Sequence, residues 1–185
     1  MPSQAQQYID DARRFQKNGN YELAIALLTQ ASQQKLSPTH ELEIQKLLSF
    51  NYRKAGNFDM ALFHINNALN LFSKCSEDKN AQKERAVCLM NKGIIYEECS
   101  RYDNALDCYL NAVNTFISLY KDDPDERGII INALFTAGTF YYKRGQFKKA
   151  YETLESALNY FGDGKELDRR YWAIKNTLQE LQCNE

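Results

Sequence analysis

The sequence contains few of the residues that punctuate β-rich folds. Only three prolines and eight glycines occur in 185 residues, whereas β-sandwiches and barrels need many more turns. Long apolar runs are also missing, since stretches such as Ile129-Ile130-Ile131 are short and a membrane span needs about 20 apolar residues. No basic cluster followed by an apolar stretch opens the sequence. We therefore expect long helices, no secretory signal and no membrane partner.

Cysteine and histidine are too scattered for a metal site or a disulfide framework. The five cysteines are odd in number and form no Cys-x-x-Cys pair, which favours reduced, packed thiols in a cytoplasmic protein. Only His40 and His64 could supply imidazole chemistry. Phosphate-binding glycine loops, zinc-protease motifs and nucleophile-elbow motifs are absent from the sequence. We predict no enzyme: no catalytic residues, no bound metal, no cofactor and no small-molecule substrate.

An excess of charge of one sign is missing as well. The chain has 23 Lys and Arg against 24 Asp and Glu, which gives a net charge of -1. This balance provides no general attraction to nucleic acid or to an anionic membrane, so we expect neither as a partner. The charge is nevertheless uneven, because residues 1–93 carry +3 and residues 94–185 carry −4.

The sequence does contain a four-fold internal repeat. Seven residues recur at intervals of 3, 4, 2, 3, 4 and 3: a small residue, an aromatic, a turn residue, an aromatic, an alanine, a large residue and an alanine. The small residues allow close helix packing, and the turn residue, a glycine or Ser100, ends the first helix in a left-handed or turn conformation. Each unit is therefore predicted to be an antiparallel helix pair. The four segments run from Ala12 to Ala31, Ser49 to Ala68, Gly93 to Ala112 and Gly138 to Ala157.

These segments resemble the tetratricopeptide repeat (TPR) family, with the matching cores NGNYELAIALLTQA, AGNFDMALFHINNA, CSRYDNALDCYLNA and RGQFKKAYETLESA. The copies are offset by 37, 44 and 45 residues instead of the usual length of about 34, which is similar to the extended repeats of kinesin light chain and Pins-type adaptors. The resemblance implies an all-α, right-handed α-solenoid of four helix-turn-helix pairs and a C-terminal capping helix, as a single domain over residues 1–185. The expected repeats are about 5–38, 42–78, 86–122 and 131–163, with the capping helix at 166–182.

Residue patterns outside the repeat also predict where two helices begin and where the last helix lies. Ser37-Pro38-Thr39 predicts the start of a helix, and the acidic segment Asp122-Asp123-Pro124-Asp125 predicts an N-cap where the helix dipole favours negative charge. Beyond the last repeat, an apolar stripe at 3–4 spacing indicates a helix that caps the array. The stripe consists of Leu167, Tyr171, Ile174, Leu178 and Leu181.

The first helices of a TPR array line its concave face, and their side chains that point away from the small residues would form a groove. This face is basic at its N-terminal end, apolar in the middle and mixed beyond. Such a groove suits an extended or helical peptide that combines acidic and apolar residues. Ordinary solvated charge also explains individual lysines and arginines, but exposed aromatics call for a partner. The candidate groove residues are Arg13, Lys17, Lys46, Phe50, Arg53, Lys54, Met90, Asn91, Ile94, Asn132, Phe135 and Tyr142.

Two functions of different classes remain open. The first is an adaptor that binds a peptide segment of a partner protein in the groove. The alternative is a structural subunit of a larger multiprotein assembly, which contacts its neighbours through its convex face or its ends. Groove substitutions should abolish binding in the first case and leave assembly unchanged in the second.

Overall fold

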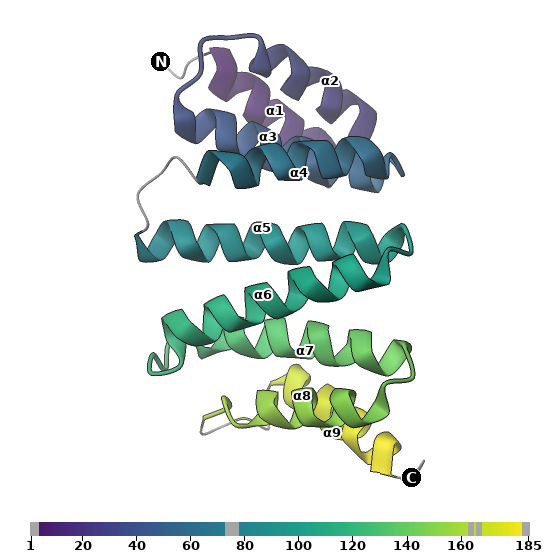
Figure 1. Ribbon diagram of the computed structural model, residues 1–185. Coiled ribbons are helices and arrows are strands. Elements are labelled where there is room, and N and C mark those ends of the chain that lie inside the picture. The colour runs from purple at the N-terminus through teal and green to yellow at the C-terminus, as the bar shows by residue number, and fades with distance from the viewer. Residues whose placement is uncertain (1–3, 73–77, 163–164, 166–167, 183–185) are drawn as a thin grey trace. The chain divides into compact units, whose positions relative to one another are not determined.

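The computed structural model describes residues 4–72, 78–162, 165 and 168–182, and these residues form nine α-helices and no β-strand (Figure 1). The all-α repeat fold expected from the sequence is confirmed. None of the described helices contains a stretch long and apolar enough to cross a bilayer. The helices are α1 (Gln4–Lys17), α2 (Tyr21–Ser32), α3 (Pro38–Lys54), α4 (Phe58–Phe72), α5 (Lys79–Glu98), α6 (Tyr102–Tyr120), α7 (Arg127–Lys143), α8 (Phe147–Leu158) and α9 (Arg169–Gln182).

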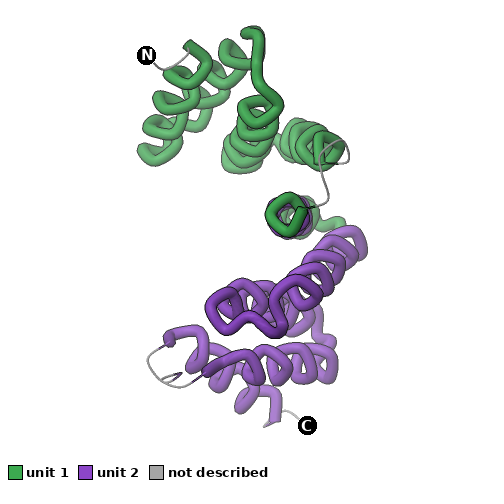
Figure 2. The backbone as a smooth tube through the Cα atoms, turned by 90° about the vertical axis from the view of Figure 1, so that its left-hand side faces the viewer, with its two compact units in different colours: residues 1–81, 94–101 green, residues 82–93, 102–185 purple. Residues whose placement is uncertain are grey.

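The chain divides into two compact units (Figure 2). Unit 1 comprises residues 1–81 and 94–101, and unit 2 comprises residues 82–93 and 102–185. Helix α5 contributes residues to both units. The prediction that residues 1–185 form one domain with right-handed stacking of all four pairs stays a prediction.

Unit 1 contains two complete helix pairs, α1 with α2 and α3 with α4, and α2 also packs on α3. Its core includes the fully buried side chains of Ile9, Leu28 and Ile44. At the small-residue position of the second repeat, Ser49 is buried and its hydroxyl donates a hydrogen bond to the carbonyl oxygen of Ala61 at 2.9 Å. The helices of this pair therefore meet closely where the repeat predicts it.

In unit 2, α6 packs on α7, α7 on α8 and α8 on α9. Its two small-residue positions are glycines because a larger residue would collide with the partner helix. A Cβ atom at Gly93 would lie 2.5 Å from Cε1 of Tyr109, and one at Gly138 would lie 2.6 Å from Cδ2 of Leu154. Tyr109 and Leu154 are themselves fully buried, so neither side chain has open space into which it can move.

Of the two conformations predicted for the turns inside the helix pairs, left-handed or turn, the structure shows the left-handed one. Gly19, Gly56 and Gly145 have φ angles of 76°, 79° and 68°, and Ser100 has a φ angle of 61°. Ser100 is the one residue other than glycine with positive φ in the described part of the chain. The third turn therefore has the same backbone shape as the others, with a side chain that disfavours it.

One of the two predicted helix starts is correct. Ser37 caps α3, and its hydroxyl accepts a hydrogen bond from the backbone N–H of His40 at 3.3 Å. The prediction that residues 122–125 cap the seventh helix is wrong, since α7 has Glu126 as its N-cap residue and no side-chain cap. Asp123 instead accepts a hydrogen bond from the N–H of Asp125 at 3.2 Å, because the chain makes a turn before the helix begins.

The predicted capping helix is confirmed as α9, which begins at Arg169. Ile174, Leu178 and Leu181 are buried on its apolar stripe, and Tyr171 is half-buried. Leu167, the first residue of the predicted stripe, lies outside the described residues. Because α9 packs on α8, it covers the flank that the last helix pair would otherwise expose.

Candidate functional site

The strongest candidate site in unit 1 is the Phe50 cluster, which we define as Phe50, Arg53, Lys54 and Glu98. The first three lie on α3, and Glu98 lies on the part of α5 that belongs to unit 1. The half-buried Phe50 ring has the guanidinium carbon of Arg53 at 5.4 Å and the ammonium nitrogen of Lys54 at 5.8 Å from its centroid. Both distances allow cation–π attraction. The structure therefore brings three predicted groove residues into contact.

The two cations of this cluster differ in what they can offer a ligand. Nη1 of Arg53 lies 2.6 Å from Oε1 of Glu98, and the Arg53 side chain is only 15% exposed. This ion pair holds the guanidinium against the ring. Lys54, in contrast, is exposed and has no carboxylate partner among the described residues. Lys54 is therefore the charge of the cluster that is free to attract an anion.

The other predicted cations of unit 1 also differ in whether a carboxylate pairs with them. Arg13 on α1 forms an ion pair with Glu43 on α3, which joins the two first helices of unit 1. Lys17 is exposed at the end of α1 and has no carboxylate partner in the described part of the chain. Lys46 is half-buried on α3. Lys17 and Lys54 thus provide positive charge at the C-terminal ends of both first helices.

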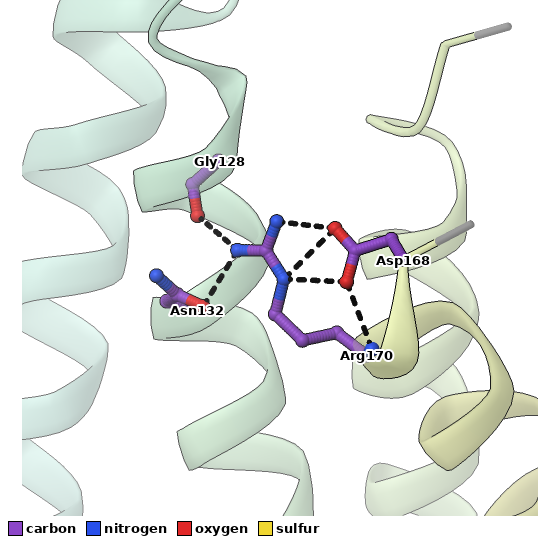
Figure 3. A network of polar contacts seen from close by, with 4 residues as sticks. All are labelled: Gly128, Asn132, Asp168 and Arg170. Atoms are coloured by element: carbon purple, nitrogen blue, oxygen red, sulfur yellow. Dashed lines mark hydrogen bonds and ion pairs between the residues drawn. The ribbon is translucent and has the colours of Figure 1, made fainter. Parts of the chain in front are cut away.

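In unit 2, the predicted groove residue Asn132 contacts the capping helix. Nη1 of Arg170 on α9 donates to the side-chain oxygen of Asn132 at 2.8 Å and to the carbonyl oxygen of Gly128 at 3.2 Å (Figure 3). Asp168 holds the same guanidinium and accepts from Nε at 3.0 Å with both carboxylate oxygens. The hydrogen bonds from Arg170 lower the pKa of the Asp168 carboxyl. The network fastens the start of α9 to α7.

Tyr142 contacts the other end of the capping helix. Its hydroxyl donates a hydrogen bond to Oε2 of Glu180 at 3.2 Å, and this bond raises the pKa of Tyr142. Asn132 and Tyr142 therefore both have partners on α9. The remaining predicted groove residues lie on α7 and α5. Phe135 is half-buried on α7, and Ile94 is half-buried on the part of α5 in unit 1. On the part of α5 in unit 2, Met90 is half-buried and Asn91 is exposed.

An open pocket of about 520 Å³ lies beside the α3–α4 turn of unit 1, lined by residues 55–59 and Cys99. The repeat explains its origin. The position of Cys99 is held in the next repeat by Arg144, whose guanidinium carbon lies 3.9 Å from the centroid of the Tyr102 ring. Cys99 is much smaller, and space remains beside Phe58, the equivalent of Tyr102. Among the described residues, no three His, Cys, Asp or Glu side chains gather as metal ligands would.

Sequence reasoning missed the carboxylates that hold the predicted cations. Glu43 and Glu98 lie 30 and 45 positions from Arg13 and Arg53 along the chain. A signal for one pair was present, because Arg53 precedes its turn glycine by three residues and Glu98 precedes Ser100 by two. Opposite charges at neighbouring positions of successive first helices predict an ion pair between repeats.

Comparison with known proteins identifies the fold. No protein-family model and no curated protein matches the sequence. Solved structures do match: kinesin light chain-like repeats from Podosopora anserina superpose with a TM-score of 0.76 at 18% identity, over 100% of this chain and 89% of that one. The chain has a TPR-like repeat fold. The apo form of RapI matches with a TM-score of 0.79 at 17% identity, over 98% of this chain and 64% of RapI.

A third structure with the TPR-like fold is the yeast histone chaperone Hif1, described as a scaffold protein that recruits protein complexes to core histones. It matches with a TM-score of 0.68 at 14% identity, over 96% of this chain and 94% of Hif1. Identities this low establish a shared fold and leave function to be argued from the side chains.

Proposed function

We propose that the chain is a non-catalytic interaction module that binds an extended or helical peptide segment of a partner protein along the first helices of unit 1. The observation that carries this proposal is the Phe50 cluster. It presents a half-buried aromatic ring on a first helix with two cations close to the ring, and Lys54 has no carboxylate partner among the described residues. A TPR-like fold supports the proposal, because repeat arrays bind partners on extended surfaces.

The chemistry of the surface indicates an acidic segment with an apolar anchor. Phe50 offers apolar area at little cost in conformational entropy, as aromatic anchors do. Lys17 and Lys54 attract carboxylates over a range that salt shortens to about 8 Å at physiological ionic strength. Arg53 orients the ring through its ion pair with Glu98. We therefore expect affinity to depend on Phe50 and association rate to depend on the two lysines.

The proposal is tested by selecting binders from a displayed library of random short peptides. We expect the enriched sequences to combine Asp or Glu with a neighbouring apolar residue. With such a peptide, Phe50→Ala should cost about 2 kcal/mol of binding free energy and mainly increase the dissociation rate. Lys54→Glu should mainly slow association, and the effect should shrink at high salt.

Lys35→Glu is the matched control, because Lys35 is exposed outside the helices and carries the same charge. It should leave binding unchanged. Charge reversal at Arg53 is unsuitable as a binding test, since it would also break the ion pair with Glu98. Selected peptides that bind the Phe50→Ala and Lys54→Glu variants as tightly as the wild type would refute the proposed site.

A specific observation also supports the structural-subunit alternative. Leu23 on α2 and Phe63 on α4 are 52% and 54% exposed, so unit 1 presents large apolar side chains on its second helices. Apolar side chains at such positions can pack against a neighbouring subunit. If the partner binds there, Leu23→Ser with Phe63→Ser should abolish its capture, while Phe50→Ala and Lys54→Glu should leave capture intact.

A further inference from the structure

The turn between α7 and α8 differs in charge from the three equivalent turns. We define the basic turn as residues 142–149, which contain Lys143, Arg144, Lys148 and Lys149 and no acidic residue. The net charge over the aligned eight residues is 0 for 16–23, +1 for 53–60, −2 for 97–104 and +4 for 142–149. The repeat itself therefore does not demand positive charge at this turn.

The four cations of the basic turn flank an exposed aromatic residue in the sequence. Phe147 is 46% exposed, and all four cationic residues are exposed. Arg144, Lys148 and Lys149 form no ion pair with a carboxylate in the described part of the chain. The charge of these three residues is thus not offset by an ion pair with any carboxylate that the structure describes.

Aromatic rings of unit 2 hold two of these cations in place. The guanidinium carbon of Arg144 lies 3.9 Å from the ring centroid of Tyr102, and the ammonium nitrogen of Lys149 lies 5.6 Å from that of Tyr141. The Phe147 ring packs against Tyr142 with the two centroids 6.0 Å apart. A surface that is already ordered loses less conformational entropy on binding.

The start of α8 adds to the positive potential. The first turns of α2, α4 and α6 carry Glu22, Asp59 and Asp103 respectively, which offset the positive end of the helix dipole. The first turn of α8 has no acidic residue, and Lys148 occupies the equivalent position. The N-cap residue Gln146 also makes no side-chain hydrogen bond to the helix.

We propose that the basic turn is a second docking surface, which binds a short acidic segment of a protein that carries an apolar residue among its carboxylates. The carboxylates would pair with Arg144, Lys148 and Lys149, and the apolar residue would cover the exposed face of Phe147. The complementary charge argues for this occupant. The surface belongs to unit 2 and does not depend on the Phe50 cluster.

The extent of the positive surface favours a short peptide over a membrane or a nucleic acid. On α8, Glu152 and Glu155 follow Lys148 by one and two helical turns and share its face of the helix, and both are exposed. A bilayer or a duplex, which is anionic over a wide area, would meet these acids next to the lysines. A short segment that ends at the turn would avoid them.

The test uses the full chain carrying Phe50→Ala and Lys54→Glu, so that the proposed site of unit 1 cannot contribute. The probe is a fluorescent synthetic peptide in which glutamates flank a single leucine, compared with the same peptide with glutamines. We expect saturable binding of the glutamate peptide alone, with amide NMR shifts concentrated in residues 142–149. Lys148→Glu with Lys149→Glu should weaken binding by about tenfold or more, and Phe147→Ala by several-fold.

Lys35→Glu with Lys121→Glu is the matched control, because it reverses the same amount of charge at two exposed lysines elsewhere and should leave binding within twofold. Lys148→Gln with Lys149→Gln provides a milder variant should the double reversal fold poorly, and it should weaken binding in the same direction. The proposal would be overturned by no saturable binding, by an equal loss in the control, or by preferential binding of phosphatidylserine vesicles or a short RNA over the peptide.

Discussion

Units 1 and 2 place different side chains at the same repeat position and obtain the same contact. Arg53 and Tyr142 both stand four residues after the small residue of their repeat, and each hydrogen-bonds a glutamate on a later helix of its own unit, Glu98 and Glu180 respectively. The neighbouring position holds Phe50 in unit 1 and Thr139 in unit 2. The contact between helices is thus a property of the fold, whereas the half-buried aromatic Phe50 beside it is particular to unit 1.

Deletion of residues 165–185 should have the largest effect, and the effect should differ between the two units. The deletion removes the partners of Asn132 and Tyr142 and uncovers the apolar flank of α8. Burial of each aliphatic side chain on the α9 stripe contributes about 1.5–3 kcal/mol, so we expect a large fall in melting temperature or aggregation. Peptides from unit 1 should keep their hydrogen-exchange protection. A truncated protein that stays monomeric and equally stable would show α9 to be a detachable tail.

The next largest effect should be shared by the two units. Ala61 in unit 1 and Ala105 in unit 2 occupy the same repeat position and are fully buried. Ala61→Leu and Ala105→Leu should each lower the free energy of unfolding by about 1–3 kcal/mol through overpacking. Ala26→Leu, on the exposed side of α2, is the control and should change stability by less than about 0.5 kcal/mol. Urea denaturation of the three variants gives the values.

The repeat intervals predicted the fold well because they report packing positions. They identified the buried alanines such as Ala61, the tight approach at Gly93 and the turn residue Ser100. The candidate site was less predictable. Whether Tyr142 faces a groove or another helix depends on the segment beyond the last repeat, and a position within the repeat carries no information about that segment.

Contacts between residues far apart in the sequence were the other obstacle to predicting the candidate site. Glu98 lies 45 positions after Arg53, and nothing local to α3 showed that it would form an ion pair with the guanidinium of Arg53. The acidic segment at residues 122–125 was misplaced for a related reason. Its local hydrogen bond from the N–H of Asp125 to Asp123 competes with helix capping, and the sequence does not show which of the two wins.

A smaller effect concerns the turn residues. Ser100 has a φ angle of 61°, whereas the equivalent Gly56 has 79° with open space around its missing side chain. Ser100→Gly should stabilise the protein by about 0.5–1 kcal/mol, because relief of the left-handed strain exceeds the added entropy of the unfolded chain. Gly56→Ser should destabilise it by a similar amount. Chemical denaturation curves that move in the same direction for both variants would contradict this explanation.

The smallest effect we expect is a pH dependence confined to unit 1, which contains both histidines of the chain. His64 is buried at the α3–α4 interface, where its ring stacks on Tyr52 at 5.3 Å and its Nδ1 donates to Oε1 of Gln45 at 2.8 Å. Burial lowers the pKa of His64 below its ordinary value of 6.5. The unfolded chain therefore binds a proton more readily than the folded one, and His64 contributes its full stability only above pH 6.5.

As the pH falls below 6.5, this contribution should be lost progressively until the lower pKa of the folded state is reached. Denaturation at a series of pH values should show the decline in the wild type and a flatter profile in His64→Gln. Hydrogen exchange, corrected for its intrinsic pH dependence, should locate the loss in peptides of unit 1. An equal loss in peptides of unit 2 would mean that the two units unfold together. The units would then differ in their packing but share one free energy of unfolding.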